Sequence, residues 1–271
     1  MRALSATAAA HLAKWDGTVV RARDAATVLV TRPGASGVEV LLMRRRTSMA
    51  FAAGMHVFPG GAVHPGDRTA VPWIGPEAEA WAGRWCCDPE LAAALVVAAV
   101  RETFEETGIL LAGTDEQAVV GAVDGDGWSA VRRALEAGEL TLGEVLRERG
   151  LALRADLLAA WAHWITPEFE PRRFDTRFFV AALPAGQPDV HHGTEADSSF
   201  WIEPAAAVRA AEAGDIAIMM PTLVNLRDLC RIDPAAVVSG ARERRITTVR
   251  PRLAVVDGQA MLTSELDAAG A

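Results

Sequence analysis

The stretch of sequence that says most about the fold is Arg101-Glu102-Thr103-Phe104-Glu105-Glu106-Thr107-Gly108-Ile109. On a helix, positions i, i+3 and i+4 share one face, so the three glutamates gather within one turn. Arg101 can reach Glu105 at i+4, which leaves Glu102 and Glu106 to hold a cation. Carboxylate oxygens of this kind suit Mg²⁺ or Mn²⁺. The alternative interpretation is a solvated acidic face, which is typical of isolated adjacent glutamates.

A glycine-rich segment upstream favours the first interpretation. Phe58-Pro59-Gly60-Gly61 is followed by His64-Pro65-Gly66-Asp67, and turns of this kind let the backbone approach other groups closely. Together with the glutamate helix, this segment resembles the Nudix box, whose pattern is G-x5-E-x7-R-E-U-x-E-E-x-G-U, with U a bulky apolar residue. Gly61 matches the first glycine, and Asp67 stands where the first glutamate belongs. The remaining matches are Arg101, Glu102, Glu105, Glu106, Gly108 and Ile109, with Thr103 at a position that is more often aliphatic.

The box is interrupted, because residues 68–100 stand where the pattern has seven residues. Asp88-Pro89-Glu90 reads as an N-cap, a proline at N1 and an acid in the first turn. We therefore expect the box helix to run from about Pro89 to Thr107 and to end at Gly108. The insertion, about residues 68–93, carries Trp73, Trp81 and Trp85 and is expected to form a loop and a short helix. These tryptophans either pack the insertion onto the domain, which we favour, or wall a substrate pocket.

An interrupted box resembles the coenzyme A diphosphatase branch of the Nudix superfamily, in particular the peroxisomal type. That branch carries a segment close to L-L-T-x-R-S-x3-R-x3-G-x3-F-P-G-G before the box. Here Leu41-Leu42-Met43-Arg44-Arg45-Arg46 leads through Gly54 to the Gly-Gly turn, with Arg45 on the first arginine of the segment. Ala50 replaces the second arginine and Arg46 the serine. The resemblance covers residues 24–230 approximately.

The resemblance implies an α/β fold, a Nudix-type α/β/α sandwich with a mixed sheet plus helical insertions. It also implies Mg²⁺- or Mn²⁺-dependent hydrolysis of a diphosphate, with CoA or acyl-CoA giving 3′,5′-ADP and 4′-phosphopantetheine. The alternatives are a diphosphatase for ADP-ribose or another nucleotide, and a non-catalytic Nudix module that binds nucleotide.

The resemblance and the chemistry of the side chains together nominate site residues. The catalytic candidates are Arg101, Glu102 and Glu105. The metal ligands are expected to be Glu102, Glu105, Glu106, the backbone carbonyl of Gly61 and, from a downstream loop, Glu195. Substrate binding is assigned to Arg45, Arg44 and Gly60. Because side chains alternate along a strand, at most two of the three arginines at 44–46 can face one pocket. Arg172, Arg173 and Arg177 are a second possible phosphate site.

Composition limits the partners. A formal charge of −8 argues against a general nucleic-acid surface. No apolar run approaches the length of a membrane span. The three cysteines include no C-x-x-C pair and hence no zinc signature. The N-terminus lacks a secretory pattern and the final Ala-Ala-Gly-Ala is no peroxisomal signal, so we expect a cytoplasmic protein that acts on a small nucleotide-diphosphate substrate. A homodimer is left open.

The coarse pattern predicts a single Nudix domain over residues 20–213, with a C-terminal helical and strand extension over 214–271 packed on it. Residues 128–164 read as a helical insertion broken at Gly138 and Gly150. The strands are expected at 25–30, 38–44, 174–182, 201–202 and within 246–263, and further helices at 204–213 and 221–229.

Overall fold

The computed structural model describes residues 2–35, 37–48, 52–187, 196–233, 236–256 and 259–263. Its centre is a mixed sheet of strand order β11-β3-β2-β10-β9-β12. The pairs β2/β10 and β9/β12 are parallel, and the other neighbours along this order are antiparallel. The bounds are β2 Arg23–Gly34, β3 Gly37–Arg45, β9 Leu158–Ile165, β10 Phe174–Ala182, β11 Ala196–Ile202 and β12 Thr248–Val249.

The strands expected at 25–30 and 38–44 form a hairpin of β2 and β3, which delivers the glycine-rich turn to the sheet. Beyond β3, strand β4 (His56–Val57) pairs with β3, and β5 (Gly60–Ala62) pairs with β2. The register sets Gly60, Gly61 and Ala62 opposite Thr27, Ala26 and Ala25. The Gly-Gly turn is therefore part of a strand, and a strand holds its backbone in a fixed position.

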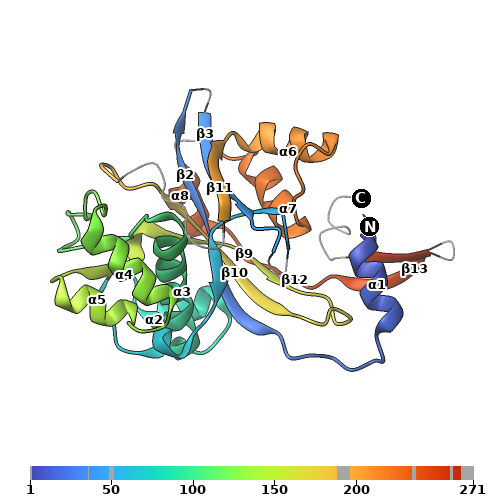
Figure 1. The fold of residues 1–271 in the computed structure, drawn as a ribbon, viewed down its shortest axis with the longest axis horizontal. Coiled ribbons are helices and arrows are strands. Elements are labelled where there is room, and N and C mark those ends of the chain that lie inside the picture. Colours follow the sequence, from blue (N-terminus) through green and yellow to red (C-terminus); the bar gives the residue numbers. More distant parts are fainter. Residues whose placement is uncertain are drawn as a thin grey trace.

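Helices cover both faces of the sheet, which confirms the α/β/α sandwich (Figure 1). One core cluster joins Ala26 and Val28 of β2 to the box helix α3, and the other joins Leu29 of the same strand to α7. Alternate β2 side chains thus enter opposite layers, as the pleat requires. The first layer holds α2 Ala78–Trp85, α3 Pro89–Thr107, α4 Asp126–Glu136 and α5 Leu142–Glu148. The second holds α6 Pro204–Ala213, α7 Met220–Leu229 and α8 Val237–Glu243.

Helix α3 has the predicted bounds. Pro89 occupies its first turn, and it ends at Gly108, whose φ of +77° is the left-handed conformation that glycine adopts without strain. Every residue from Ala94 to Thr107 is buried, because the sheet, α2 and α4 surround this part of the helix. Its charged side chains must therefore find partners inside the protein.

The insertion packs onto the domain, as we favoured. Trp81 and Trp85 of α2 are buried, and their rings lie 5.5 and 5.1 Å from the ring centre of Phe179 on β10. Trp73 opens β6 (Trp73–Ile74), which joins a small sheet of order β6-β8-β7. The partner strands are β7 Ala112–Gly113 and β8 Ala152–Arg154. Two short 3-10 helices complete this region, η1 Pro65–Arg68 and η2 Ala155–Leu157.

The helical prediction for residues 128–164 was wrong over its second half. Helices α4 and α5 occupy the first half, but β8 and β9 follow, and β9 is a central strand of the main sheet. Almost every β9 residue is buried, so the strand shows no alternation of polar and apolar residues. A continuous apolar run of this kind cannot be assigned to helix or strand by periodicity alone.

The first and last strands that the structure describes pair with each other beside the main body. Strand β1 (Arg2–Ala3) pairs with β14 (Gln259–Thr263), which pairs with β13 (Arg252–Val256), so the predicted strand pair within 246–263 is confirmed. Figure 1 shows helix α1 (Ala6–Lys14) next to this small sheet. In the part of the chain that the structure describes, no helix has the combination of length and apolar character that crossing a bilayer requires.

The packing of α2 yields a stability prediction. Replacing Trp85 by alanine should lower the free energy of unfolding by about 3–5 kcal/mol, because it leaves a cavity against Phe179. Trp85→Phe should cost under about 1.5 kcal/mol, since within the described residues the indole Nε1 donates no hydrogen bond. Urea unfolding measures both, and equal losses in the two variants would contradict this packing.

Candidate active site

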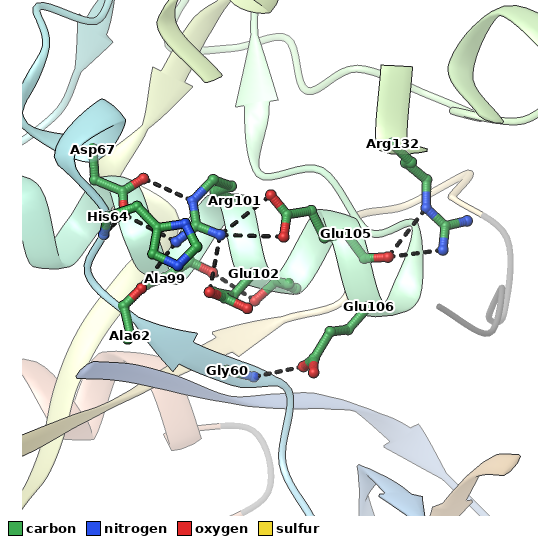
Figure 2. A network of polar contacts seen from close by, with 11 residues as sticks. Gly60, Ala62, His64, Asp67, Ala99, Arg101, Glu102, Glu105, Glu106 and Arg132 are labelled. Atoms are coloured by element: carbon green, nitrogen blue, oxygen red, sulfur yellow. Dashed lines mark hydrogen bonds and ion pairs between the residues drawn. The ribbon is translucent and has the colours of Figure 1, made fainter. Parts of the chain in front are cut away.

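Arg101 holds the polar centre of the molecule together (Figure 2). Its Nε and Nη2 donate to the two carboxylate oxygens of Asp67 at 2.7 and 2.9 Å, a bidentate pair. Its Nη1 donates to Glu102 at 2.9 Å and to Glu105 at 3.1 Å, and Nη2 also donates to the carbonyl of Ala62 at 3.1 Å. One buried guanidinium is thus shared among three carboxylates.

Asp67 lies at the point where the insertion leaves the box. Its second oxygen also accepts the backbone N–H of His64 at 2.8 Å, which fixes the short helix η1. The chain leaves the site just after Asp67 and returns to it at Arg101, so the two ends of the interruption are joined by a side-chain pair. The site is continuous although the sequence pattern is not.

The expected Arg101–Glu105 pair is confirmed, but one inference drawn from it was wrong. Glu102 was expected to be free of Arg101, but Nη1 of Arg101 donates to both Glu102 and Glu105. Helical spacing pairs Arg101 only with Glu105, at i+4. Spacing takes no account of the length of the arginine side chain, which lets its end reach both glutamates.

Glu102 and Glu106 face the glycine-rich strand β5. A Cβ built on Gly61 would come 2.4 Å from Oε1 of Glu102, so the absent side chain is the space that the carboxylate occupies. Glu106 accepts the backbone N–H of Gly60 at 2.7 Å. A Cβ on Gly60 would meet the carbonyl of Ala26 at 2.4 Å. Both glycines are therefore required by close approach, one to a catalytic candidate and one to β2.

The carboxyl group of Glu105 is electrostatically unusual. Burial raises its pKa to about 7; the charge of Arg101 opposes this rise and that of Glu102 adds to it. Burial alone would lower the pKa of Arg101, but the hydrogen bonds and charges of Asp67, Glu102 and Glu105 raise it overall. Arg101 therefore stays charged, while Glu105 can exchange a proton near neutral pH.

Sequence analysis missed three contributors to this site. Arg132 of α4 is buried and donates from Nη2 to the backbone carbonyl of Glu105 at 2.9 Å. In Figure 2 the ring of His64 lies beside the Arg101 guanidinium. Burial, followed by the charge of Arg101, lowers the pKa of His64. The third is the pairing of Asp67 with Arg101. The proline and glycine around Asp67 signalled a turn, but no sequence spacing identifies a partner across an insertion or in another helix.

The donor set fits a hard divalent cation chemically. Glu102, Glu105 and Glu106 are buried, and Gly61 leaves space for the Glu102 carboxylate. The three carboxylates and the Gly61 carbonyl all offer oxygen ligands. As they stand, Glu102 and Glu105 face Arg101 and Glu106 faces Gly60. Accordingly, no three His, Cys, Asp or Glu side chains within the described ranges are grouped as a formed metal site. Cation binding here would require the carboxylates to turn from these partners.

The other site residues expected from the sequence lie away from this cluster or outside the described residues. Arg44 is exposed and Arg45 half-buried at the end of β3. Arg173 is buried and donates to the carbonyls of Thr166 and Val20, while Arg177 is paired with Asp24 and Asp175. Those two arginines are held within the protein, which disfavours the second phosphate site. Glu195, with His191 and His192, lies outside the described residues.

The approach of Gly61 to Glu102 can be tested directly. Gly61→Ala should lower the free energy of unfolding by about 1–3 kcal/mol, because Glu102 or strand β5 must move. Gly83→Ala is the matched control, since this exposed glycine of α2 has open space around its Cβ position. The control should be neutral or slightly stabilising. Urea unfolding measures the free energy of unfolding of both variants. Equal changes in Gly61→Ala and Gly83→Ala would contradict the close approach of Gly61 to Glu102.

The raised pKa of Glu105 also leads us to expect that stability depends on pH. A folded pKa of about 7, above the ordinary glutamate value of 4.5, favours the neutral carboxyl in the fold. The stability this gives is complete below about pH 4.5 and is lost as pH rises through about 7. In EDTA, Glu105→Gln should therefore gain stability relative to wild type across this window. Glu79→Gln, at an exposed position of α2, serves as control. A constant difference between Glu105→Gln and wild type would show that Glu105 does not titrate there.

Comparison with known proteins agrees with this geometry. The family described as the NUDT19 Nudix domain matches residues 88–232, more than half of the chain. A putative nudix hydrolase 7 of Caenorhabditis elegans is 30% identical over 71% of this chain and 56% of its own length. The acyl-coenzyme A diphosphatase NUDT19 of Homo sapiens is 28% identical over 73% of this chain and 62% of its own. The chain thus spans about three fifths of these relatives.

A solved structure also shares the architecture. The NUDIX hydrolase from Alicyclobacillus acidocaldarius superimposes with a TM-score of 0.67 and 29% sequence identity, over 82% of this chain and 97% of the other. The matched region includes the carboxylate helix α3, and the Gly-Gly strand β5 precedes it in the chain. The chain belongs to the Nudix hydrolases, in the family of the NUDT19 Nudix domain.

Proposed function

We propose that this protein hydrolyses the diphosphate linkage of a nucleoside diphosphate-X compound with Mg²⁺ or Mn²⁺, and that its substrate is CoA or acyl-CoA. The observation that carries the reaction class is the buried cluster of Glu102, Glu105 and Glu106 around Arg101. The support for the substrate is the similarity to relatives named acyl-coenzyme A diphosphatase, together with the pre-box segment around Arg45. Water would add to one phosphorus, the bridging P–O bond would break, and 3′,5′-ADP and 4′-phosphopantetheine would leave.

The chain's own residues suggest a division of labour. Glu102 and Glu106, with the Gly61 carbonyl, would hold the divalent cation, which when bound neutralises diphosphate charge. Arg101 positions Glu102 and Glu105 and is itself positioned by Asp67. Glu105 is our proposed proton acceptor, since burial raises its pKa to about 7 and a general base works best near the operating pH.

Turnover across a small panel tests the proposed substrate. CoA, an acyl-CoA, ADP-ribose, NADH and a nucleoside triphosphate are compared with Mg²⁺ and with Mn²⁺, and the released phosphate ester is identified. Preference for the CoA compounds is the expected result. Preference for ADP-ribose or a triphosphate would keep the catalytic cluster and overturn the substrate. Absence of turnover on the whole panel would contradict the proposal and favour a nucleotide-binding module.

Loss of one carboxylate tests the catalytic assignment. Glu106→Gln keeps the side-chain volume and an acceptor for the Gly60 N–H, but removes the charge. Turnover of the best panel substrate should fall by about 100-fold or more, because electrostatic stabilisation at the reacting centre is lost. Glu79→Gln should match wild type. If Glu106→Gln stayed within about threefold of wild type, the metal assignment would be wrong.

A further inference from the structure

A basic groove lies beside the box loop, at the start of β2. It is lined by Arg21, Ala22, Arg23, Asp24, Val63 and Arg68, and its volume is about 310 Å³. The arginines come from two segments distant in sequence, the entry to β2 and the end of η1. Neither the box pattern nor the pre-box segment includes any of them.

The groove is positively charged. Arg21 and Arg23 are exposed, and neither takes part in an ion pair with another residue in the described part of the chain. Arg68 meets Glu90 at 3.4 Å, a distant and exposed contact of the kind that contributes little. The carboxylate among the lining residues, Asp24, accepts from Arg177 at 2.9 Å, a guanidinium that Asp24 shares with Asp175.

Backbone pairing fixes the distance from this groove to the catalytic cluster. The N–H of Val63, in the groove, donates to the carbonyl of Asp24 at 2.9 Å, which extends the β2/β5 register by one step. Gly61, which faces Glu102, precedes Val63 by two residues. At the rise of a strand, that separation is about 7 Å. The Val63 backbone in the groove therefore lies along the same strand as the Gly61 backbone, which adjoins Glu102.

His64 connects the two regions electrostatically. Burial lowers its pKa first, the charge of Arg101 lowers it further, and Arg23 adds a smaller lowering effect. The imidazole thus lies within the fields of both the catalytic arginine and a groove arginine.

Resting on the diphosphatase function proposed above, we propose that Arg21, Arg23 and Arg68 form a subsite for a phosphomonoester that the substrate carries apart from its scissile diphosphate, the 3′-phosphate in the case of CoA. Guanidinium groups bind phosphate by paired, charge-assisted hydrogen bonds, and several can share its oxygens. In CoA one ribose separates the 3′-phosphate from the diphosphate, which agrees with a groove two residues along the strand from Gly61. The subsite would select nucleotides phosphorylated on the ribose.

This assignment differs from the role that the pre-box segment gives Arg45. Arg45 ends β3, and the groove arginines lie at the start of the adjacent strand β2 and on η1. Near these two ends the strands do not pair with each other, because β3 pairs with β4 and β2 pairs with β5. The two candidates can therefore be tested separately in one set of variants.

The test compares CoA with dephospho-CoA, which differ only in the 3′-phosphate. KM and kcat are measured for wild type, Arg23→Ala, Arg68→Ala, the double variant Arg21→Ala/Arg23→Ala and Arg45→Ala. Arg209→Ala is the matched control, an exposed arginine of α6 on the opposite layer. The preference for CoA over dephospho-CoA, taken as the ratio of their KM values, should fall about tenfold in the groove variants. It should be unchanged in Arg209→Ala.

Equal KM effects on both substrates would overturn the subsite, as would loss of the preference only in Arg45→Ala. Calorimetric binding of adenosine 3′,5′-bisphosphate against AMP separates this failure from failure of the proposed function. If wild type hydrolysed neither CoA nor dephospho-CoA, the proposed function would be contradicted. The proposed subsite would still be supported if adenosine 3′,5′-bisphosphate bound more tightly than AMP and the groove variants lost that difference. Equal binding of both nucleotides to wild type would overturn it.

Discussion

The site depends on one buried interaction, the bidentate pair between Arg101 and Asp67. Arg101 is 4% exposed and Asp67 is 2% exposed, so neither charge is stabilised by water. The pair ties η1 to α3 and points the remaining arginine donors at Glu102, Glu105 and the Ala62 carbonyl. Removing Arg101 would leave three buried carboxylates without their shared cation, and breaking a buried ion pair in this way typically costs about 3–5 kcal/mol, about a third of a domain's stability.

This pair also explains how the box tolerates an insertion. The chain leaves at Asp67 and returns within α3, so the inserted residues form a loop whose ends are already in contact. Lengthening such a loop costs little entropy, since the cost rises only with the logarithm of its length. The insertion also contributes its own burial through Trp81 and Trp85 against Phe179. It adds a packed element to the domain without displacing the carboxylates.

Features fixed by local spacing could be predicted from the sequence. The bounds of α3 follow from Pro89 and Gly108, and the shared face of its glutamates follows from the helical repeat. Features that depend on remote partners could not. Strand β9 has no polar face to reveal it, Arg132 approaches Glu105 from another helix, and Arg101 reaches Asp67 across the insertion. The pattern placed Asp67 in the box but gave no reason for an acid there, and the arginine it pairs with is that reason.

A double-mutant cycle between Asp67 and Arg101 tests this account most directly. The free energy of unfolding is measured for Asp67→Ala, Arg101→Ala, the double variant and wild type, by urea denaturation in EDTA. We expect each single change to be strongly destabilising and the double variant to lose less stability than the two single variants together, with a coupling free energy of at least about 1 kcal/mol. Additive losses would contradict it, because they would mean that the two ends of the interrupted box are held independently.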